Sequence, residues 1–327
     1  MTPKITLLFT SVGRRVELMQ AFRRAAVKTG IRLKLIGADI TDTAPALTCC
    51  DSTVIVPRIK DPAYIPALLE ICKAQGVTAL IPTIDTDLLL LAKEKDKFAA
   101  IGTTVVISSP EKIAICRDKS NTSDYFSSLG LYAPEAVSDI ARYRGGFPAF
   151  IKPADGSSSI GANRADSMEE LAGYAAQLDR YVVQPFAHGT EYTVDIFCDL
   201  QGNPIYITPR IRSAVRAGEV LKTEIRHEKS IIAEMQTLIR DFKPCGGITV
   251  QLIRNEETGV NQYIEINPRF GGGAPLSIKA GADSAAAMLR LLAGEALPYF
   301  PEAAADCAVF SRFDQSVCVA KGSGKKI

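Results

Sequence analysis

Short β-rich runs alternate with helix-patterned segments over the first third of the chain, and this alternation constrains the fold more than any other feature. Two apolar runs, 5–9 and 33–38, are separated by a segment at 15–28 whose apolar residues recur at helical spacing. Strand–helix alternation of this kind predicts a parallel sheet with helices on both faces. The remaining strands are expected at 53–56, 79–81 and 105–107, and the remaining helices at 64–75 and 88–95.

Polar residues follow three of these expected strands. The stretch 13–15 follows the first strand, Asp39 follows the second, and the stretch 85–87 follows the strand that closes at Pro82. Ligands of doubly wound sheets bind beyond the carboxyl ends of the strands. We therefore expect this edge of the sheet to face a ligand.

The pattern changes near residue 110. Ser109 and Pro110 form an N-cap signal with proline at the first helical position, and a helix over 118–129 is expected to end at Gly130. After Phe147 the chain is rich in strands, which predicts an antiparallel α+β body carrying a smaller insert. The strands are expected at 149–152, 181–185, 192–198, 205–208, 249–253 and 263–266, and the helices at 168–178, 230–242 and 285–292.

Composition excludes several classes of protein. The 38 Lys+Arg and 36 Asp+Glu of the 327 residues nearly cancel, so the bulk charge that nucleic-acid or anionic-membrane binding needs is missing. No apolar run approaches the ~20 residues of a membrane span. Eight cysteines without a C-x-x-C pair, and only two histidines, argue against structural zinc and histidine-based triads. We expect free thiols, a cytoplasmic location, and chemistry based on carboxylates, amides, Lys, Arg and a hard metal.

A candidate metal site lies in the segment 263–273, which reads YIEINPRFGGG. Glu265 and Asn267 are two apart on an expected strand, so their side chains share a face. Gln251, on the strand before the turn at 256–259, can lie across from Glu265. Two or three oxygen ligands on one face suit Mg²⁺, which keeps phosphate and water as its other ligands. An edge strand with a polar face and a glycine turn would explain the segment less well.

A candidate phosphate site is the Gly/Ser loop at 155–161, which follows the expected strand that ends at Lys152. Small residues allow successive backbone N–H groups to surround phosphate oxygens, and Lys152 could neutralise a phosphate. The loop lacks the G-K-[ST] ending of a Walker A sequence. A plain hairpin explains such a loop at least as well, so both interpretations stay open.

Two further polar groups could contact ligands. The bend at 185–190 could offer backbone groups to a purine edge, and Glu191 could bind ribose hydroxyls, although a simple inter-strand loop also fits. Arg210 and Arg212 share a face if their segment is extended, with Arg216 and Lys222 further along. Guanidinium groups suit carboxylate or phosphate oxygens, and a solvated polar face is the equal alternative.

These elements, in this order, resemble the ATP-grasp superfamily, and most closely its single-module carboxylate–amine ligases related to the synthetase half of the carbamoyl phosphate synthetase large subunit. The most specific matches are the segments 151–153 (IKP) and 265–269 (EINPR), and the segments 10–15 and 82–87 are similar to that subgroup too. The resemblance implies a pre-ATP-grasp α/β domain at 1–112, a small ATP-grasp lobe with a linker helix at 113–188, and a large lobe at 189–327.

The resemblance also implies roles for individual residues. The residues that would contact ATP are Lys119, Lys152, Gly156, Ser157, Ser158, Ser159, Gly161, Gln184, Pro185, Phe186 and Glu191. Gln251, Glu265 and Asn267 would hold one or two Mg²⁺ ions, with Mn²⁺ as an alternative. Arg269, Arg210 and Lys152 would act on the transferred phosphoryl group. The candidates for substrate binding, expected to face the cleft, are Arg14, Asp85, Arg212 and Arg216.

The function implied by the resemblance is ATP-dependent ligation. A substrate carboxylate would be activated as an acyl phosphate and joined to an amine, with release of ADP and phosphate. The alternatives are a carbamoyl-phosphate-synthetase-like enzyme that uses bicarbonate or carbamate, and a nucleotide-binding regulatory module without turnover. The expected partners are small molecules, with neither nucleic acid nor membrane, and a homodimer is compatible with the resemblance.

Overall fold

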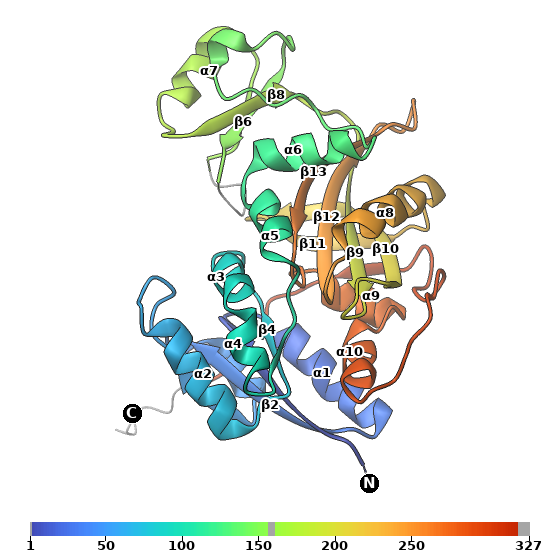
Figure 1. Cartoon of the computed structure of the whole chain (residues 1–327). Coiled ribbons are helices and arrows are strands. Elements are labelled where there is room, and N and C mark those ends of the chain that lie inside the picture. Colours follow the sequence, from blue (N-terminus) through green and yellow to red (C-terminus); the bar gives the residue numbers. More distant parts are fainter. Residues whose placement is uncertain (1, 156–160, 320–327) are drawn as a thin grey trace, which may run out of the picture.

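Three β-sheets organise the chain in the computed structural model, which describes residues 2–155 and 161–319 (Figure 1). A five-stranded sheet forms the N-terminal unit, a three-stranded sheet forms a small lobe, and a six-stranded sheet forms a large lobe. The small lobe, with α7, β6 and β8, lies at the end of the molecule opposite the N-terminal unit (Figure 1). Gly156, Ser157, Ser158 and Ser159, which the sequence nominates for phosphate binding, lie outside the described residues.

The N-terminal sheet is parallel and has the order β3-β2-β1-β4-β5. Side chains of β1 alternate between its two faces. Leu7 and Phe9 join one apolar core, while Leu8 joins the other. This confirms the doubly wound arrangement. The strands are β1 (Lys4–Thr10), β2 (Arg32–Asp39), β3 (Ser52–Ile55), β4 (Ala79–Pro82) and β5 (Thr104–Val105).

The helices of this unit follow the predicted pattern with one break. The expected helix at 88–95 is two helices, which meet at Glu94. The expected end of the helix at 64–75 is confirmed, because Gly76 follows it with a φ of 58°, a conformation that glycine adopts without strain. The helices are α1 (Val16–Thr29), α2 (Tyr64–Gln75), α3 (Leu88–Lys93), α4 (Lys95–Ala99) and the 3₁₀ helix η1 (Pro45–Cys49).

Two short helices, α5 (Pro110–Arg117) and α6 (Lys119–Ser128), connect this unit to the lobes. The side chain of Ser109 accepts a hydrogen bond from the N–H of Lys112, as the capping signal predicts. The side chain of Asp118 likewise caps α6. Each helix therefore begins at a fixed residue, and Lys119 comes to lie at the junction between them.

The small lobe is an antiparallel sheet of order β7-β6-β8 with α7 (Met168–Ala175) packed on it. Strands β6 (Ala149–Pro153) and β8 (Tyr181–Pro185) lie where the sequence predicts them, and α7 is three residues shorter than expected. The strand β7 (Asn163–Ala165) was not predicted. It pairs with β6 in antiparallel orientation and forms one edge of this sheet.

The large lobe is an antiparallel sheet of order β13-β12-β9-β10-β11-β14. The strand expected at 205–208 is much longer, because its polar second half pairs with β11 in a hairpin that sequence patterning does not reveal. The strands are β9 (Thr190–Cys198), β10 (Pro204–Arg216), β11 (Glu219–Ile225), β12 (Gly247–Arg254), β13 (Asn261–Asn267) and β14 (Val309–Ser311). The helices are α8 (Lys229–Phe242), α9 (Ala274–Ala280), which was not predicted, and α10 (Ser284–Leu292).

The N-terminal unit and the large lobe share one apolar core. Helix α1 packs against α9 and α10 (Figure 1). The ring of Phe22 in α1 lies edge-on to Phe270, with 6.1 Å between the ring centroids. None of the helices within 2–155 and 161–319 has the length and apolar content of a bilayer-spanning segment. All eight cysteines fall in these ranges and none of them forms a disulfide bond, as expected.

Candidate functional site

A cleft of about 640 Å³ lies where the N-terminal unit, the α5–α6 junction and both lobes meet. Its lining includes Asp85 from the loop after β4, Lys119 from the start of α6, Lys152 from β6 and Glu265 from β13. The β4 loop is the strand end that the sequence nominates for ligand contact. The volume falls in the ordinary range of small-molecule sites.

The expected oxygen ligands meet on one wall of this cleft. Gln251 on β12 pairs directly across the sheet from Glu265 on β13, after a register shift between Gln251 and Leu252, and Asn267 lies two residues further along. The amide nitrogen of Asn267 donates a 2.8 Å hydrogen bond to Oε1 of Glu265. The described residues contain no cluster of three His, Cys, Asp or Glu side chains. One carboxylate with two amide oxygens still fits Mg²⁺, which binds few protein ligands when phosphates complete its shell.

Two lysines face the same carboxylate. Burial lowers the pKa of Lys152, which is 6% exposed, to about 8, and the nearby Glu265 partly opposes this shift. Burial also lowers the pKa of Lys119, again opposed first by Glu265. A buried ammonium group is costly unless negative charge lies close to it. The pair of lysines is therefore suited to an anionic ligand in the cleft.

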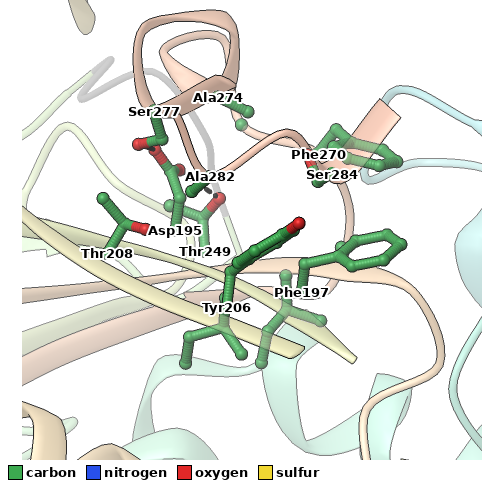
Figure 2. A pocket seen from close by; sticks show the side chains of 14 residues that line it. Asp195, Phe197, Tyr206, Thr208, Thr249, Phe270, Ala274, Ser277, Ala282 and Ser284 are labelled. Atoms are coloured by element: carbon green, nitrogen blue, oxygen red, sulfur yellow. Dashed lines mark hydrogen bonds between the residues drawn. The ribbon is translucent and has the colours of Figure 1, made fainter. Parts of the chain in front are cut away.

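Arg210 forms part of the cleft floor although its side chain is only 2% exposed. Its Nε donates a 2.8 Å hydrogen bond to Oδ2 of Asp195 on the neighbouring strand. Ser277 donates a 2.6 Å hydrogen bond to the same oxygen, and Thr249 donates a longer one, 3.4 Å, to the other. Figure 2 shows Asp195 between Ser277 and Thr249, beside a small internal cavity. Within the described residues, Nη1 of Arg210 has no hydrogen-bond partner.

The three consecutive glycines after Phe270 each leave room for a side chain of the cleft. A Cβ at Gly271 would lie 2.7 Å from Oγ1 of Thr249, and one at Gly272 would lie 2.1 Å from Oε2 of Glu219. A Cβ at Gly273 would lie 2.3 Å from Nη2 of Arg210. Contacts under 3 Å are sterically excluded, so this loop and these side chains can approach one another only where no Cβ is present.

Arg269 reaches from the large lobe to the N-terminal unit. Its Nη2 lies 2.6 Å from Oδ2 of Asp85, and both side chains are largely buried. Its Nη1 donates to the carbonyl oxygen of Phe270, so the guanidinium is held from two sides. Among the described residues, Nε of Arg269 has no hydrogen-bond partner.

The residues nominated for the nucleoside lie at the small-lobe side of the cleft. Gln184 is buried and lines the cleft together with Phe186, whereas Pro185 is not among the lining residues. Glu191 also lines the cleft, and its Oε1 lies 3.0 Å from Nε of Arg212. Burial raises the pKa of Glu191, and Arg212 opposes that shift. Gly161 lies at the edge of the described part of its loop, with a φ of 73°.

The four candidates for substrate binding separate into two groups. Asp85 and Arg212 line the cleft, although each is engaged in an ion pair. Arg14 is exposed and Arg216 bonds to Asp314 at 2.9 Å, and neither of them lines the cleft, contrary to expectation. The lining residue is instead Arg15. The sequence could not distinguish two adjacent arginines, because the turn after β1 decides which one faces inward.

Two residues of the site have no clear signal in the sequence: Glu219, which lines the cleft, and Asp195, which holds Arg210 from behind the cleft. Glu219 begins β11, which was not predicted, and it reaches the cleft only through the β10–β11 hairpin. Asp195 lies on the predicted strand at 192–198. Its pairing with Arg210 depends on the register between β9 and β10, which aligns Asp195 with Thr208.

Two family models match the chain. Residues 7–106 match the model described as PylC-like, N-terminal domain. Residues 177–312 match the model described as ATP-grasp in the biosynthetic pathway with Ter operon. The first match covers the N-terminal sheet, and the second covers most of the large lobe, including Glu265 and Asn267.

Curated relatives match parts of the chain. The carbamoyl-phosphate synthase of Methanobrevibacter smithii is 24% identical over 154 residues, which cover 45% of this chain and 41% of that protein. The 3-methyl-D-ornithine–L-lysine ligase of Methanosarcina acetivorans is 26% identical over 183 residues, which cover 55% of this chain and 46% of that protein. A D-alanine–D-alanine ligase from Alcanivorax borkumensis is 34% identical over 91 residues, covering 26% and 30%. The chain thus spans less than half the length of each of these relatives.

Solved structures share the fold over most of the chain. The ADP complex of N5-carboxyaminoimidazole synthetase from Staphylococcus aureus has a TM-score of 0.73 at 15% identity, over 91% of this chain and 80% of that one. The L-amino acid ligase from Bacillus licheniformis has a TM-score of 0.69 at 16% identity, over 89% of this chain and 75% of that one. Taken with the ATP-grasp model matched over 177–312, these likenesses show that the chain has the fold of the ATP-grasp ligases.

Proposed function

We propose that the chain is an ATP- and Mg²⁺-dependent ligase that activates a substrate carboxylate by phosphorylation and joins it to an amine, releasing ADP and phosphate. The observation that carries this proposal is the meeting of Gln251, Glu265 and Asn267 with Lys119 and Lys152 in one cleft. Oxygen ligands beside buried ammonium groups are what a metal–triphosphate needs. The named ligases among the relatives support the same reaction class.

The triphosphate would lie between the two lysines and the oxygen ligands. Mg²⁺ held by Gln251, Glu265 and Asn267 would neutralise charge on the phosphates. Gln184 and Phe186 would border the base, and Glu191 would take the ribose hydroxyls. Because Glu191 is paired with Arg212 at 3.0 Å, its carboxylate is held in place before any ligand arrives.

Arg269 and Arg210 would stabilise the phosphoryl group during its transfer. Each is fixed by an aspartate and has a buried N–H, Nε in Arg269 and Nη1 in Arg210, that finds no partner among residues 2–155 and 161–319. Donors fixed in advance lower the barrier because they need no reorganisation when charge develops. The substrate carboxylate attacks the γ-phosphorus, ADP leaves, and the amine then displaces phosphate from the acyl phosphate. No nucleophilic side chain is required.

The test is ³¹P NMR of the protein with ATP, Mg²⁺, pooled amino acids, common amines and bicarbonate. ADP and phosphate that form only with an organic carboxylate and an amine would support the ligase. Phosphate release that depends on bicarbonate alone would favour the carbamoyl-phosphate-synthetase-like alternative. AMP and pyrophosphate would refute the acyl-phosphate route.

The variant that tests the metal site is Glu265→Gln, which keeps the shape of the side chain and removes its charge. The proposal expects Mg²⁺-dependent turnover to fall by at least about tenfold, because a charged metal ligand is lost. Unchanged binding of MgADP by this variant, with no turnover by the wild type on any pool member, would favour the nucleotide-binding regulatory module instead.

A further inference from the structure

Arg15 occupies the N-terminal-unit side of the cleft with only weak partners. Its side chain is 19% exposed, and its Nη1 lies 3.6 Å from Oε1 of Glu219. Its Nη2 donates a 3.3 Å hydrogen bond to the carbonyl oxygen of Thr83. A mostly buried guanidinium normally forms shorter, forked contacts with a carboxylate. Arg15 can therefore take a further oxygen ligand.

Positive charge is in excess around Arg15. Burial lowers the pKa of Arg15, and the next largest cause is repulsion from Arg269, with Arg312 acting in the same direction. The carboxylates that oppose this are Glu219 and Asp85. Arg312 also pairs with Glu17 at 3.0 Å, and Glu17 pairs with Lys279 at 2.7 Å. In this network four cationic side chains face three carboxylates, which leaves one positive charge without a counterpart. An anion placed next to Arg15 would be stabilised by this imbalance.

Glu219 is the less committed of the two carboxylates. Asp85 is engaged by Arg269 at 2.6 Å and is 17% exposed. Glu219 is 49% exposed, and its ion pairs with Arg15 and Arg312 are long, at 3.6 and 3.4 Å. The missing Cβ of Gly272 allows the Glu219 carboxylate to lie against the glycine loop. It can therefore accept a ligand cation without breaking a short bond.

We propose that Arg15 and Glu219 form a subsite for an amino acid, in which Arg15 binds the carboxylate and Glu219 binds the ammonium group. The inference rests on the proposed function and names the class of its carboxylate substrate. A simple inorganic anion would use Arg15 but would leave Glu219 as an unfavourable neighbour. Val215 and Val220, which pair across the hairpin beside Glu219, also line the cleft and provide an apolar wall for a side chain.

Binding is measured by isothermal titration in the presence of the magnesium complex of a non-hydrolysable ATP analogue. The probes are glycine and the L- and D-forms of the nineteen chiral proteinogenic amino acids. For each one that binds, the decarboxylated amine and the deaminated acid are titrated as well. We expect the amino acid to bind at least about tenfold more tightly than either partial analogue, because each lacks one charge-assisted contact.

Four variants assign the contacts. Arg15→Met and Glu219→Gln should each weaken binding of the amino acid by at least about tenfold. Arg14→Met is the matched control, since it removes the same kind of side chain one residue away and outside the cleft, and it should leave the affinity within about twofold. Arg15→Lys, which keeps the charge but loses the fork, should recover part of the affinity and guards against a folding defect in Arg15→Met.

The inference is overturned if no amino acid of the set binds the wild-type protein. It is equally overturned if Arg15→Met binds as tightly as the wild type, or if the deaminated acid binds as tightly as the amino acid. Failure of the proposed function is distinct from these results. Amino-acid binding that needs Arg15, without ADP formation, would support the subsite and contradict the ligase activity. Turnover with a carboxylate that lacks an ammonium group would support the ligase activity and contradict the subsite.

Discussion

Arg269 and Asp85 are 184 positions apart in the sequence, yet their side chains form a 2.6 Å ion pair inside the cleft. The aspartate belongs to the loop after β4 in the N-terminal unit, and the arginine follows β13 of the large lobe. The N-terminal unit thereby fixes a residue that we assign to phosphoryl transfer. The sequence nominates Asp85 for substrate binding, and its ion pair with Arg269 gives it a role in positioning that arginine as well.

Asp85→Asn should lower kcat and leave the KM for ATP nearly unchanged. The substitution keeps the shape of the side chain but weakens its hold on Arg269, and a hydrogen bond to a charged group contributes about 1.5–3 kcal/mol. We expect kcat to fall on the order of tenfold to hundredfold. The control is Lys28→Met, which removes a 3.0 Å ion pair with Asp283 between the same two parts of the molecule but outside the cleft. An equal loss of kcat in the control would show that the effect is structural.

Nucleotide binding should weaken as the pH rises above about 8. Lys152 has its pKa lowered to about 8, so the ammonium group that would contact a phosphate loses its proton in this range. The stability of the ligand-free protein should change in the opposite direction. Between about pH 8 and the unfolded value of 10.5, the unfolded lysine keeps the proton that the native lysine has lost, so the free energy of unfolding rises with pH.

Lys152→Met removes both effects of this titration. The Lys152→Met protein should bind MgADP weakly, and its affinity should not show the decrease above about pH 8 that the wild type shows. Calorimetric titration of both proteins from pH 7 to pH 9.5 measures the difference. Parallel pH profiles for the two proteins would contradict the assignment of Lys152 to the phosphates.

Gly273→Ala should weaken the binding of a triphosphate more than that of a diphosphate. The new Cβ would lie 2.3 Å from Nη2 of Arg210, and Arg210 cannot easily move because Asp195 holds it and it is buried. The matched control is Gly173→Ala in α7, where a Cβ meets nothing within 4 Å. That control should be as stable as the wild type or more stable, by up to about 1 kcal/mol. Equal affinities of the wild type and Gly273→Ala for both nucleotides would remove Arg210 from the site.

Asp87→Asn should change the pH dependence of stability without changing the cleft. Asp87 is fully buried and accepts hydrogen bonds from Thr10 and Tyr64, and burial raises its pKa to about 6 from 3.8. Between these values the native protein holds a proton that the unfolded chain has released. The free energy of unfolding should therefore fall, by about 3 kcal/mol in all, as the pH rises from 4 towards 6. Urea titrations of the wild type and of Asp87→Asn across this pH range should show the decrease in the free energy of unfolding in the wild type alone.

The fold was predictable to the extent that local pattern determines it. Strand–helix alternation correctly gave the parallel N-terminal sheet, and capping signals such as Ser109 located helix starts. The second half of β10 was missed because its side chains follow no alternation and its partner β11 is identified only by pairing. Helix α9 was missed because it begins in a glycine run that reads as a turn.

The site was predictable where residues lie close together in the sequence. A short hairpin joins β12 to β13 and brings Gln251 near Glu265, but a register shift between Gln251 and Leu252, which the sequence does not reveal, places the two residues directly opposite each other. The contacts made by long-range packing were not predictable. The inward position of Arg15, the approach of Glu219 to Gly272, and the support of Arg210 by Asp195 all depend on how separate elements meet in space.

The core shared by α1, α9, α10 and Phe270 restricts how the cleft can open and close. Phe270 is anchored in that core and its neighbour Arg269 lies in the cleft, so separating the N-terminal unit from the large lobe would break the most extensive packing in the molecule. The small lobe has its own core, formed by residues such as Ile151, Leu171 and Val183. Because the small lobe, which carries Lys152 and Gln184, does not share that core, a change in its position would leave the packing between the N-terminal unit and the large lobe intact.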